Sequence, residues 1–411
     1  MSSVTKDPKP RSPLSFPAYR RVFIARAVSS AGSYMQVVAA SWLVYHLTNS
    51  ATAVGVLTSL ALGPALVGGP LGGILADRHD PRRLAVLLSL LQAAACTALV
   101  VLELSGRLTV DLLYLCVFAG AIPFSLNQPI ISLIIPYTVP EEYRHTAVAR
   151  ASMIFNLTRL AGAVVGGVLV TAIGVAAAFG LNAASYALVA LVLWRTKLLV
   201  GSEDSLHRSH PAGVSGGLRD GLGHQLMRLV ALSTALFFTL VAPIEQLMPT
   251  IAREHGLTAT SVGVLVGFIG VGALAANPFM NSRHRSTRDR QRLMATGLAV
   301  SACGLVVLAV TPSQGLVIDL VAVMAVGFGW EFVFVNGQGT VALDLPVELR
   351  GRMMGVFFML VTATTAVGAL LIGYLFDQFG LAVSLLANAA VVAAGAVVIA
   401  LRSRRQPPVV P

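Results

Sequence analysis

The chain has 411 residues, of which 56% are hydrophobic and 11% are charged. Soluble domains carry roughly 25% charged residues, so this composition excludes an ordinary soluble protein. About twelve apolar runs come close to the ~20 residues with which a helix crosses a bilayer. Such runs must be helices, because in lipid every backbone group has to be satisfied within its own segment. We therefore predict an all-α membrane protein with twelve transmembrane helices.

The net charge of +11 would suit a nucleic-acid partner, but the positive residues are sorted by membrane side. Every Lys and Arg except Arg26, Arg107, Arg159 and Arg253 falls in the N-terminal stretch, the even-numbered loops or the C-terminal stretch. Cytoplasmic loops carry such an excess of positive charge. The pattern predicts a multi-pass protein of the cell membrane with both termini cytoplasmic, and it argues against nucleic acid as a partner.

Three cysteines, Cys96, Cys116 and Cys303, are scattered through apolar runs. Their spacing fits neither a metal site nor a disulfide framework, so we interpret them as packing residues and expect no metal or cofactor. No Ser/His/Asp, phosphate-loop or metal-ligand spacing stands out elsewhere. The chain is therefore not expected to be an enzyme.

The first membrane segment, about residues 22–47, carries a polar stripe. Arg26, Ser29, Ser33, Gln36 and Ala40 recur at spacings of three and four, which places them on one helix face. A polar face on a membrane helix usually borders a cavity or another helix. Arg26 and Gln36 are therefore candidates for substrate or proton coupling. For Arg26, the alternative is a side chain that reaches the lipid headgroups.

A charged break at residues 73–83 joins the second and third segments and reads Gly-Ile-Leu-Ala-Asp-Arg-His-Asp-Pro-Arg-Arg. A short arginine-rich turn between two membrane-length runs has to lie in water. It resembles the signature loop of the major facilitator superfamily. The matching residues are Gly73, Asp77, Arg78, Arg82 and Arg83. With Asp80-Pro81 in place of a single glycine, the loop resembles the branch of drug and siderophore exporters, the transmembrane secretion effectors, which includes enterobactin exporters and macrolide efflux proteins.

This resemblance implies a fold and a role for the loop. The fold is two pseudo-symmetric six-helix bundles in one monomeric chain. By analogy with the family, the Asp77 carboxylate and the arginines of the loop latch the cytoplasmic ends of the helices as the protein alternates between its states.

The fifth segment combines a charge with closely spaced glycines. Arg159 lies near the middle of the membrane, where a charge needs a partner or a wet cavity. Gly162, Gly166 and Gly167 follow, and they resemble the antiporter motif of this superfamily with Ala163 in place of its proline. Such glycines also let a neighbouring helix approach closely. The motif favours export, with helix packing as the simpler interpretation.

The chain divides into five stretches. They are a cytoplasmic N-terminal tail (1–20), a six-helix bundle (21–196), a cytoplasmic linker rich in Ser, Gly and His (197–224), a second six-helix bundle (225–401) and a cytoplasmic C-terminal tail (402–411). The bundles are an internal repeat: Gly162 and Gly167 recur as Gly368 and Gly373 at one offset. Two repeats related by an axis along the membrane normal predict a site between them.

The second bundle holds two acids within apolar runs. Glu245 lies between Pro243 and Pro249, so the seventh segment should be broken there. It is either an intramembrane site residue or a solvated residue at a helix end. We count it among the candidates for proton or substrate coupling.

Glu331 lies in the middle of the tenth segment and is the first candidate for proton or substrate coupling. Phe328 and Phe334 lie three residues to either side, and Gln338 follows one turn further on. Aromatic rings beside a buried acid suit an amphipathic or cationic ligand. The alternative is a structural carboxylate that is paired across helices.

These features together predict a secondary active transporter that exports hydrophobic or amphipathic small molecules, such as drugs, antibiotics or siderophores, by alternating access and proton antiport. One alternative is uptake of a nutrient or metabolite by symport or uniport, and a second is a membrane receptor or scaffold that does not transport. The sequence does not identify the substrate, because specificity within such a scaffold depends on cavity shape.

Overall fold

The computed structural model describes residues 12–196, 225–280, 286–311, 316–345 and 347–404, and every regular element in these ranges is a helix. The N-terminal bundle consists of η1 (Pro13–Ser15), α1 (Pro17–Thr48), α2 (Ala51–Leu62), α3 (Ala65–Arg78), α4 (Pro81–Leu104), α5 (Val110–Ile134), η2 (Ile135–Thr138), η3 (Glu141–Tyr143), α6 (Arg144–Ile173) and α7 (Val175–Arg195).

The C-terminal bundle consists of α10 (Gln225–Leu240), η4 (Ala242–Glu245), α11 (Met248–Glu254), α12 (Ala259–Ala276), η5 (Asn277–Met280), α13 (Thr287–Val310), α14 (Leu316–Leu343), α15 (Val347–Phe379) and α16 (Leu381–Arg404). The break in the seventh segment is present, because the chain leaves α10, passes through η4 and restarts as α11 at the two prolines.

The membrane character of the helices is confirmed. Within the described residues, ten helical segments are long and apolar enough to cross a bilayer, and α6 contributes a shorter apolar stretch, Leu157–Ile173. Helix α1 is 32 residues long and carries the polar stripe. The all-α membrane fold is therefore established, and the count of twelve crossings stays a prediction that depends on α1 and α6.

The element boundaries differ in detail from those predicted. Helix α1 starts at Pro17, inside the predicted N-terminal tail, and α16 runs to Arg404, inside the predicted C-terminal tail. The second segment is two helices, because Pro64 lacks the N–H that would continue α2. The predicted linker, 197–224, lies outside the described residues.

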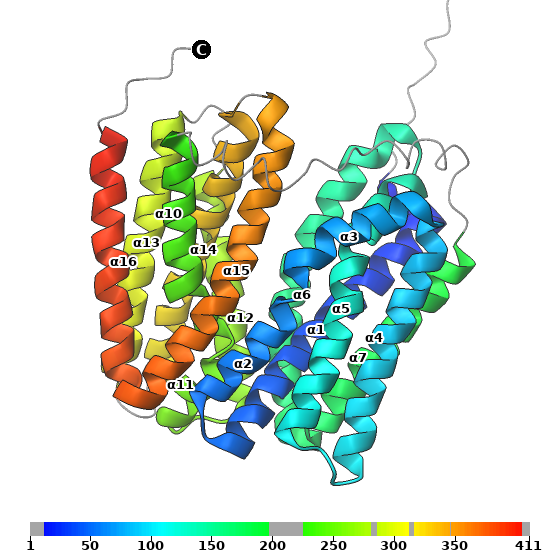
Figure 1. Cartoon of the computed structure of the whole chain (residues 1–411), viewed down its shortest axis with the longest axis horizontal. Helices are drawn as coiled ribbons and strands as arrows, with labels where there is room; N and C mark the ends of the chain where they lie inside the picture. The colour runs from blue at the N-terminus through cyan, green and yellow to red at the C-terminus, as the bar shows by residue number, and fades with distance from the viewer. Residues whose placement is uncertain (1–11, 197–224, 281–285, 312–315, 346, 405–411) are drawn as a thin grey trace, which may run out of the picture.

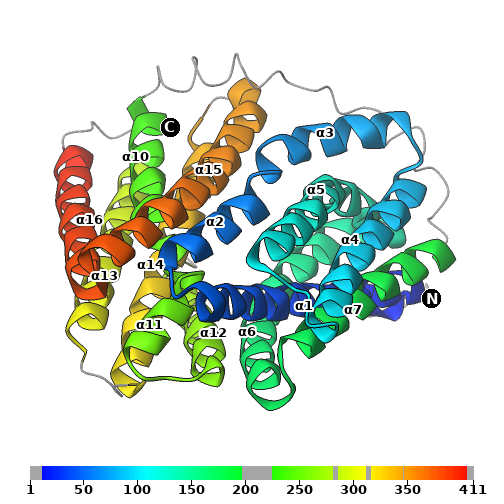
Figure 2. The ribbon, with the colours of Figure 1, turned by 60° about the horizontal axis from the view of Figure 1, so that its bottom comes forward.

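The two bundles stand side by side (Figure 1). We call the end where α7 finishes and α10 starts the linker end, and the end where α1 turns into α2 the far end. The ribbons of the two bundles meet near the far end, at the bottom of Figure 1, and separate toward the linker end. Figure 2, turned to bring the bottom forward, shows α2 beside α15 and α12 beside α6.

Glycines let the bundles touch at two symmetric crossings near the far end. Between α2 and α15, a Cβ on Gly373 would lie 2.5 Å from the carbonyl oxygen of Ala51. Between α6 and α12, a Cβ on Gly167 would lie 2.9 Å from the Cα of Gly263. Gly167 and Gly373 are counterparts in the sequence repeat, so the repeat marks the interface between the bundles.

The same two crossings carry polar contacts across the interface. The carboxylate of Asp377, in the last turn of α15, accepts hydrogen bonds from Ser50 Oγ at 2.6 Å and from the N–H groups of Ala51 and Thr52 at 2.8 and 2.9 Å. It therefore caps the N-terminus of α2, where a negative charge is stabilising. At the other crossing, Thr260 donates to Thr171 at 2.8 Å.

We expect Gly373→Ala to weaken the closed far end. The added methyl group has no space against the α2 backbone, and such overpacking costs about 1–3 kcal/mol. Thermal unfolding of the purified protein in detergent should show a lower Tm. Gly355→Ala on the same helix is the matched control, since a Cβ there meets nothing within 4 Å. An equal effect of both changes would show that the crossing does not limit stability.

Candidate functional site

The signature loop ties α4 to α7 inside the N-terminal bundle. Asp80 caps α4, accepting from the N–H groups of Arg82 and Arg83 at 2.9 and 3.4 Å, with Pro81 at the first helical position. Arg82 Nε donates to the carbonyl of Leu193 at 2.7 Å, and its Nη2 donates to the next carbonyl. The Asp80-Pro81 pair is thus a helix start, and Arg82 binds the C-terminus of α7.

The remaining motif residues lie in the last turns of α3, where Gly73 and Asp77 are partly buried and Arg78 is exposed. The C-terminal bundle repeats the arginine contact without the Gly–Asp pattern, since Arg288 Nε donates to the carbonyl of Ser403 at 3.1 Å near the end of α16. The latch role of the loop itself stays a prediction.

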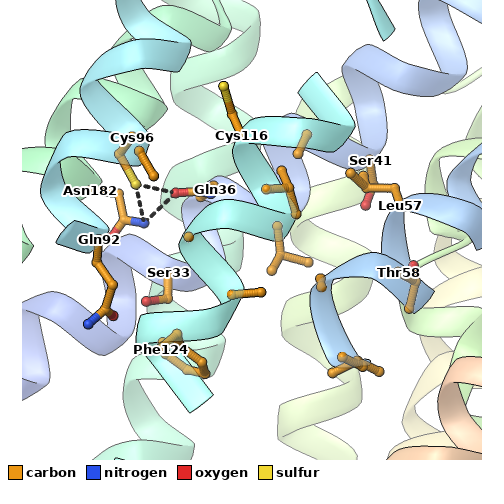
Figure 3. A pocket seen from close by; sticks show the side chains of 18 of the residues that line it. Ser33, Gln36, Ser41, Leu57, Thr58, Gln92, Cys96, Cys116, Phe124 and Asn182 are labelled. Carbon is orange, nitrogen blue, oxygen red and sulfur yellow. Dashed lines mark hydrogen bonds between the residues drawn. The ribbon is translucent and has the colours of Figure 1, made fainter. Parts of the chain in front are cut away.

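The polar stripe on α1 faces into the N-terminal bundle. Ser33 shares a hydrogen bond with the Tyr186 hydroxyl at 2.9 Å. Gln36 Oε1 accepts from Asn182 Nδ2 at 2.6 Å and from the Cys96 thiol at 3.0 Å, as the dashed lines of Figure 3 show. The stripe therefore meets polar groups of α4 and α7, and Cys96 is a member of this network as well as a packing residue.

Two adjoining cavities of about 200 and 310 Å³ lie beside this stripe. Helices α1, α4, α5 and α7 form most of their walls, and Gln246 of the C-terminal bundle lines both. Figure 3 shows the first cavity, with Ser33, Gln36 and Phe124 around it. Arg26 borders the second cavity, so the lining follows α1 for about 22 Å, from Arg26 to Ser41, at ~1.5 Å per residue.

Aromatic rings pack the corresponding region of the C-terminal bundle. Helices α10 and α14 are the second-half counterparts of α1 and α5. Phe238 of α10 lies with its ring centroid 5.0 Å from that of Trp330 and 6.2 Å from that of Phe334, both on α14. Phe334 also contacts Phe357 of α15 at 5.7 Å. The two bundles therefore share a scaffold but differ in what fills it.

A buried ion pair joins the bundles beside the cavities. Arg159 of α6 pairs with Glu245 of η4, with side chains only 12% and 5% exposed. The guanidinium carbon lies 4.6 Å from the ring centroid of Trp330 and 6.0 Å from that of Tyr34, and the charge interacts electrostatically with Glu331. The broken seventh segment positions Glu245 for this contact, so Glu245 is buried in a pair rather than solvated at a helix end.

The predicted aromatic neighbours of Glu331 are engaged elsewhere. Phe328 stacks on Phe332, with ring centroids 4.4 Å apart, and approaches Phe279 at 5.7 Å. Phe334 belongs to the packed cluster, and Gln338, farther along α14, is partly buried. The ring that faces the Arg159–Glu245 pair is Trp330.

Sequence reasoning missed Trp330, Tyr34 and Gln246 as members of this region. Trp330 precedes Glu331 and Gln246 follows Glu245 in the chain, so their position next to a candidate acid could have identified them. Tyr34 lies next to Ser33 of the polar stripe, but nothing in its spacing distinguishes it from a lipid-facing aromatic residue.

The glycines of the predicted antiporter motif are contact positions. A Cβ on Gly162 would lie 2.4 Å from the carbonyl oxygen of Ala31, and one on Gly166 would lie 2.7 Å from the Cα of Met35, both on α1. Gly167 faces α12 of the other bundle. The glycines of the motif therefore allow α6 to pack closely against α1 and α12, and this packing positions the helix that carries Arg159.

Two bundles of membrane helices, with cavities beside α1 in the N-terminal bundle and a charged contact between the bundles, have the architecture of a membrane transporter of the major facilitator type. The model of the transmembrane secretion effector family matches residues 9–407, and the chain belongs to this family. The resemblance inferred from the signature loop is thereby confirmed, as is the expectation that the protein is not an enzyme.

Related proteins and structures agree with this class. The chain is 26% identical to the multidrug efflux pump Tap of Mycobacterium tuberculosis, over 95% of this chain and 94% of the relative. It is also 26% identical to the enterobactin exporter EntS of Salmonella typhimurium, over 96% and 95%. The crystal structure of the nucleoside transporter NupG superposes with a TM-score of 0.78 at 12% identity, over 95% of this chain and 100% of that one.

A bacterial homologue of the lysosomal transporter Spinster, in an inward-facing unoccupied conformation, superposes with a TM-score of 0.73 at 16% identity, over 97% of this chain and 98% of that one. At such identities the two structural matches establish the fold alone.

We predict that the Arg159–Glu245 pair stabilises the protein as a unit. Removing one member of a buried pair typically costs about 3–5 kcal/mol, because the other charge stays buried. Arg159→Gln should lower the Tm more than Glu245→Gln, since it leaves two carboxylates together. The double variant should melt closer to wild type than the sum of the single changes implies. Glu141→Gln, which removes an exposed ion pair, is the control and should change the Tm little. Additive losses would contradict the coupling.

Proposed function

We propose that the protein exports hydrophobic or amphipathic small molecules by alternating access and couples export to proton entry. Two relatives that span almost the whole chain carry the names multidrug efflux pump and enterobactin exporter, and both names describe export. The cavities support a small-molecule substrate, because their walls combine apolar side chains with a few convergent polar groups.

The observation that carries the proposal is the link between the cavities and the buried ion pair. Gln246 lines both cavities, and its neighbour in the chain, Glu245, holds Arg159. A substrate that contacts Gln246 therefore acts on the turn that positions Glu245. Through this turn, substrate binding in the cavities of the N-terminal bundle would alter the Arg159–Glu245 contact that joins the two bundles.

The charges at this contact suit a single exchangeable proton. Arg159 contributes one positive charge, and Glu245 and Glu331 contribute two negative charges when both are ionised. One proton makes the group neutral while leaving Arg159 with a carboxylate. In our proposal, substrate and proton occupy the protein in alternate states, and Glu331 is the site that gains and loses the proton.

The two ends of the molecule would open in turn. The far end is closed by the glycine crossings and by the Asp377 cap on α2, and these contacts have to separate in an outward-open state. We assign the linker end to the cytoplasm on the positive-residue distribution, so the described state faces inward in this proposal. Movement between the states would be a rocking of one bundle against the other.

The direct test is transport in inverted membrane vesicles from cells that express the protein. Three fluorescent amphiphiles cover the possible charges: ethidium as a cation, Nile red as a neutral compound and dansylalanine as an anion. We expect protonophore-sensitive accumulation of at least one of them, absent in vesicles from an empty-vector control. Accumulation only in right-side-out vesicles would instead indicate uptake, and accumulation in neither would reject a transporter of this substrate class.

For the transported compound, we expect Glu331→Gln to abolish the dependence of transport on the pH gradient, because the amide cannot exchange a proton. Transport rates are to be measured in proteoliposomes with and without an imposed gradient. Glu254→Gln, at an exposed position, makes the same exchange and should retain the wild-type dependence. A normal pH profile in Glu331→Gln would return Glu331 to a structural role.

The latch role of the signature loop has its own test. Asp77→Asn removes the carboxylate charge but keeps the size of the side chain, so expression and Tm should stay near wild type while transport falls at least fivefold. Asp111→Asn, at the exposed start of α5, is the matched control. Transport at the wild-type rate in Asp77→Asn would exclude the latch role.

A further inference from the structure

In the ranges that the structure describes, one positive charge borders the larger of the two cavities beside α1, and no carboxylate lines that cavity with it. Arg26 lines this cavity of about 310 Å³, and its Nη2 donates to Gln128 Oε1 at 3.1 Å. Among the described residues, none of the ion pairs involves Arg26. The side chain therefore turns into the N-terminal bundle, where Gln128 offers it a neutral acceptor and no counter-ion. A partly buried cation in this situation is stabilised when an anion joins it.

Uncharged polar side chains surround Arg26 in the cavity wall. Within the described part of the chain, Ser30 Oγ, Asn127 Oδ1 and Gln246 Oε1 are buried and have no hydrogen-bond partner. All three residues line the same cavity as Arg26, and Asn127 is only 5% exposed. The Ser30 hydroxyl can donate to an acidic group, whereas the two amide oxygens can only accept, so Arg26 is the group in this wall that favours an anion.

The opposite end of the lining is uncharged. The adjoining cavity of about 200 Å³ is lined mainly by apolar side chains such as Val37, Leu57, Val117 and Ala121, with Ser41 and Thr58 beside Leu57. Phe124 borders both cavities and lies between the two regions. The lining thus changes from a positive charge at Arg26 to uncharged, mainly apolar walls beside Leu57, and this order suits a molecule with an acidic group at one end and a largely apolar body.

We propose that the cavities bind an amphipathic anion, with its acidic group at Arg26 and its apolar body toward Leu57. The ligand would supply the counter-charge that Arg26 lacks. This inference rests on the proposed exporter function and narrows its substrate class. It also departs from the cationic ligand that the sequence suggests for Glu331, because the Glu331 carboxylate faces the positive charge of Arg159.

The test compares two probes that share one fluorophore and differ in charge. Dansylalanine carries a carboxylate, and dansylcadaverine carries an ammonium group. Fluorescence titration of the purified full-length protein in detergent gives a Kd for each. We expect wild type to bind dansylalanine at least tenfold more tightly than dansylcadaverine. Arg26→Gln should weaken dansylalanine binding at least tenfold and leave dansylcadaverine binding unchanged or stronger, and Arg26→Lys should retain most of the anion affinity.

Two controls separate the site from general effects. Arg21→Gln makes the same exchange at an exposed position of the same helix and should change neither Kd by more than twofold. Without a probe, Arg26→Gln should melt at the wild-type temperature or above it, because the exchange removes a partly buried charge that has no counter-ion among the described residues. A structural arginine would show the opposite. Dansylalanine should raise the Tm of wild type but not that of Arg26→Gln.

Equal Kd values for the two probes, no binding of dansylalanine by wild type, or unchanged binding by Arg26→Gln would each overturn the anion site. Should Arg26→Gln fail to fold, the wild-type preference between the probes decides. Arg26-dependent binding without transport in vesicles would overturn the exporter function alone. Protonophore-sensitive transport without Arg26-dependent binding would overturn this inference alone.

Discussion

The arrangement of the two bundles depends on the neutralisation of Arg159. A charge in the middle of a bilayer costs from about 3 to above 10 kcal/mol, so its helix cannot be placed without a counter-charge. Arg159 belongs to the N-terminal bundle, whereas Glu245, with which it pairs, and Glu331, which acts on it electrostatically, belong to the C-terminal bundle. This buried ion pair therefore acts between the bundles rather than within either. Any movement of one bundle against the other must keep Arg159 paired or replace its partner.

The internal repeat produces two similar scaffolds with different contents. At the repeat offset, Phe124 and Gln128 of α5 correspond to Trp330 and Phe334 of α14. In the C-terminal bundle these rings pack against α10, so little space remains there. In the N-terminal bundle Gln128 binds Arg26 instead, and the space beside α1 stays open. Of these two equivalent regions, the one beside α1 is thus open and the one beside α10 is packed, and Gln246 of the C-terminal bundle reaches the cavities beside α1.

Several features of the site followed from residue patterns. The spacing of Arg26, Ser33 and Gln36 predicted a polar face toward a cavity or helix, and these residues border the cavities. The burial of Arg159 required a partner, but the pattern did not say which. Its partner, Glu245, is far away in the chain and belongs to the other repeat, and no local periodicity connects residues that meet across a pseudo-symmetry axis. For the same reason, spacing along α14 pointed to Phe328, three residues from Glu331, and did not show that Trp330 lies over the Arg159 guanidinium.

By itself, the sequence determined the membrane class, the helical fold, the break in the seventh segment and the family, because these depend on local quantities: run length, hydropathy, proline positions and a short motif. Only the tertiary structure decided which glycines touch across the interface, which acid holds Arg159 and which bundle contains the cavities. These outcomes depend on side-chain volume and distance between helices that are remote in the chain. A cation inside a membrane protein calls for a negative group nearby. Only the packing of the helices shows whether the chain provides one, as at Arg159, or provides none among the described residues, as at the partly buried Arg26.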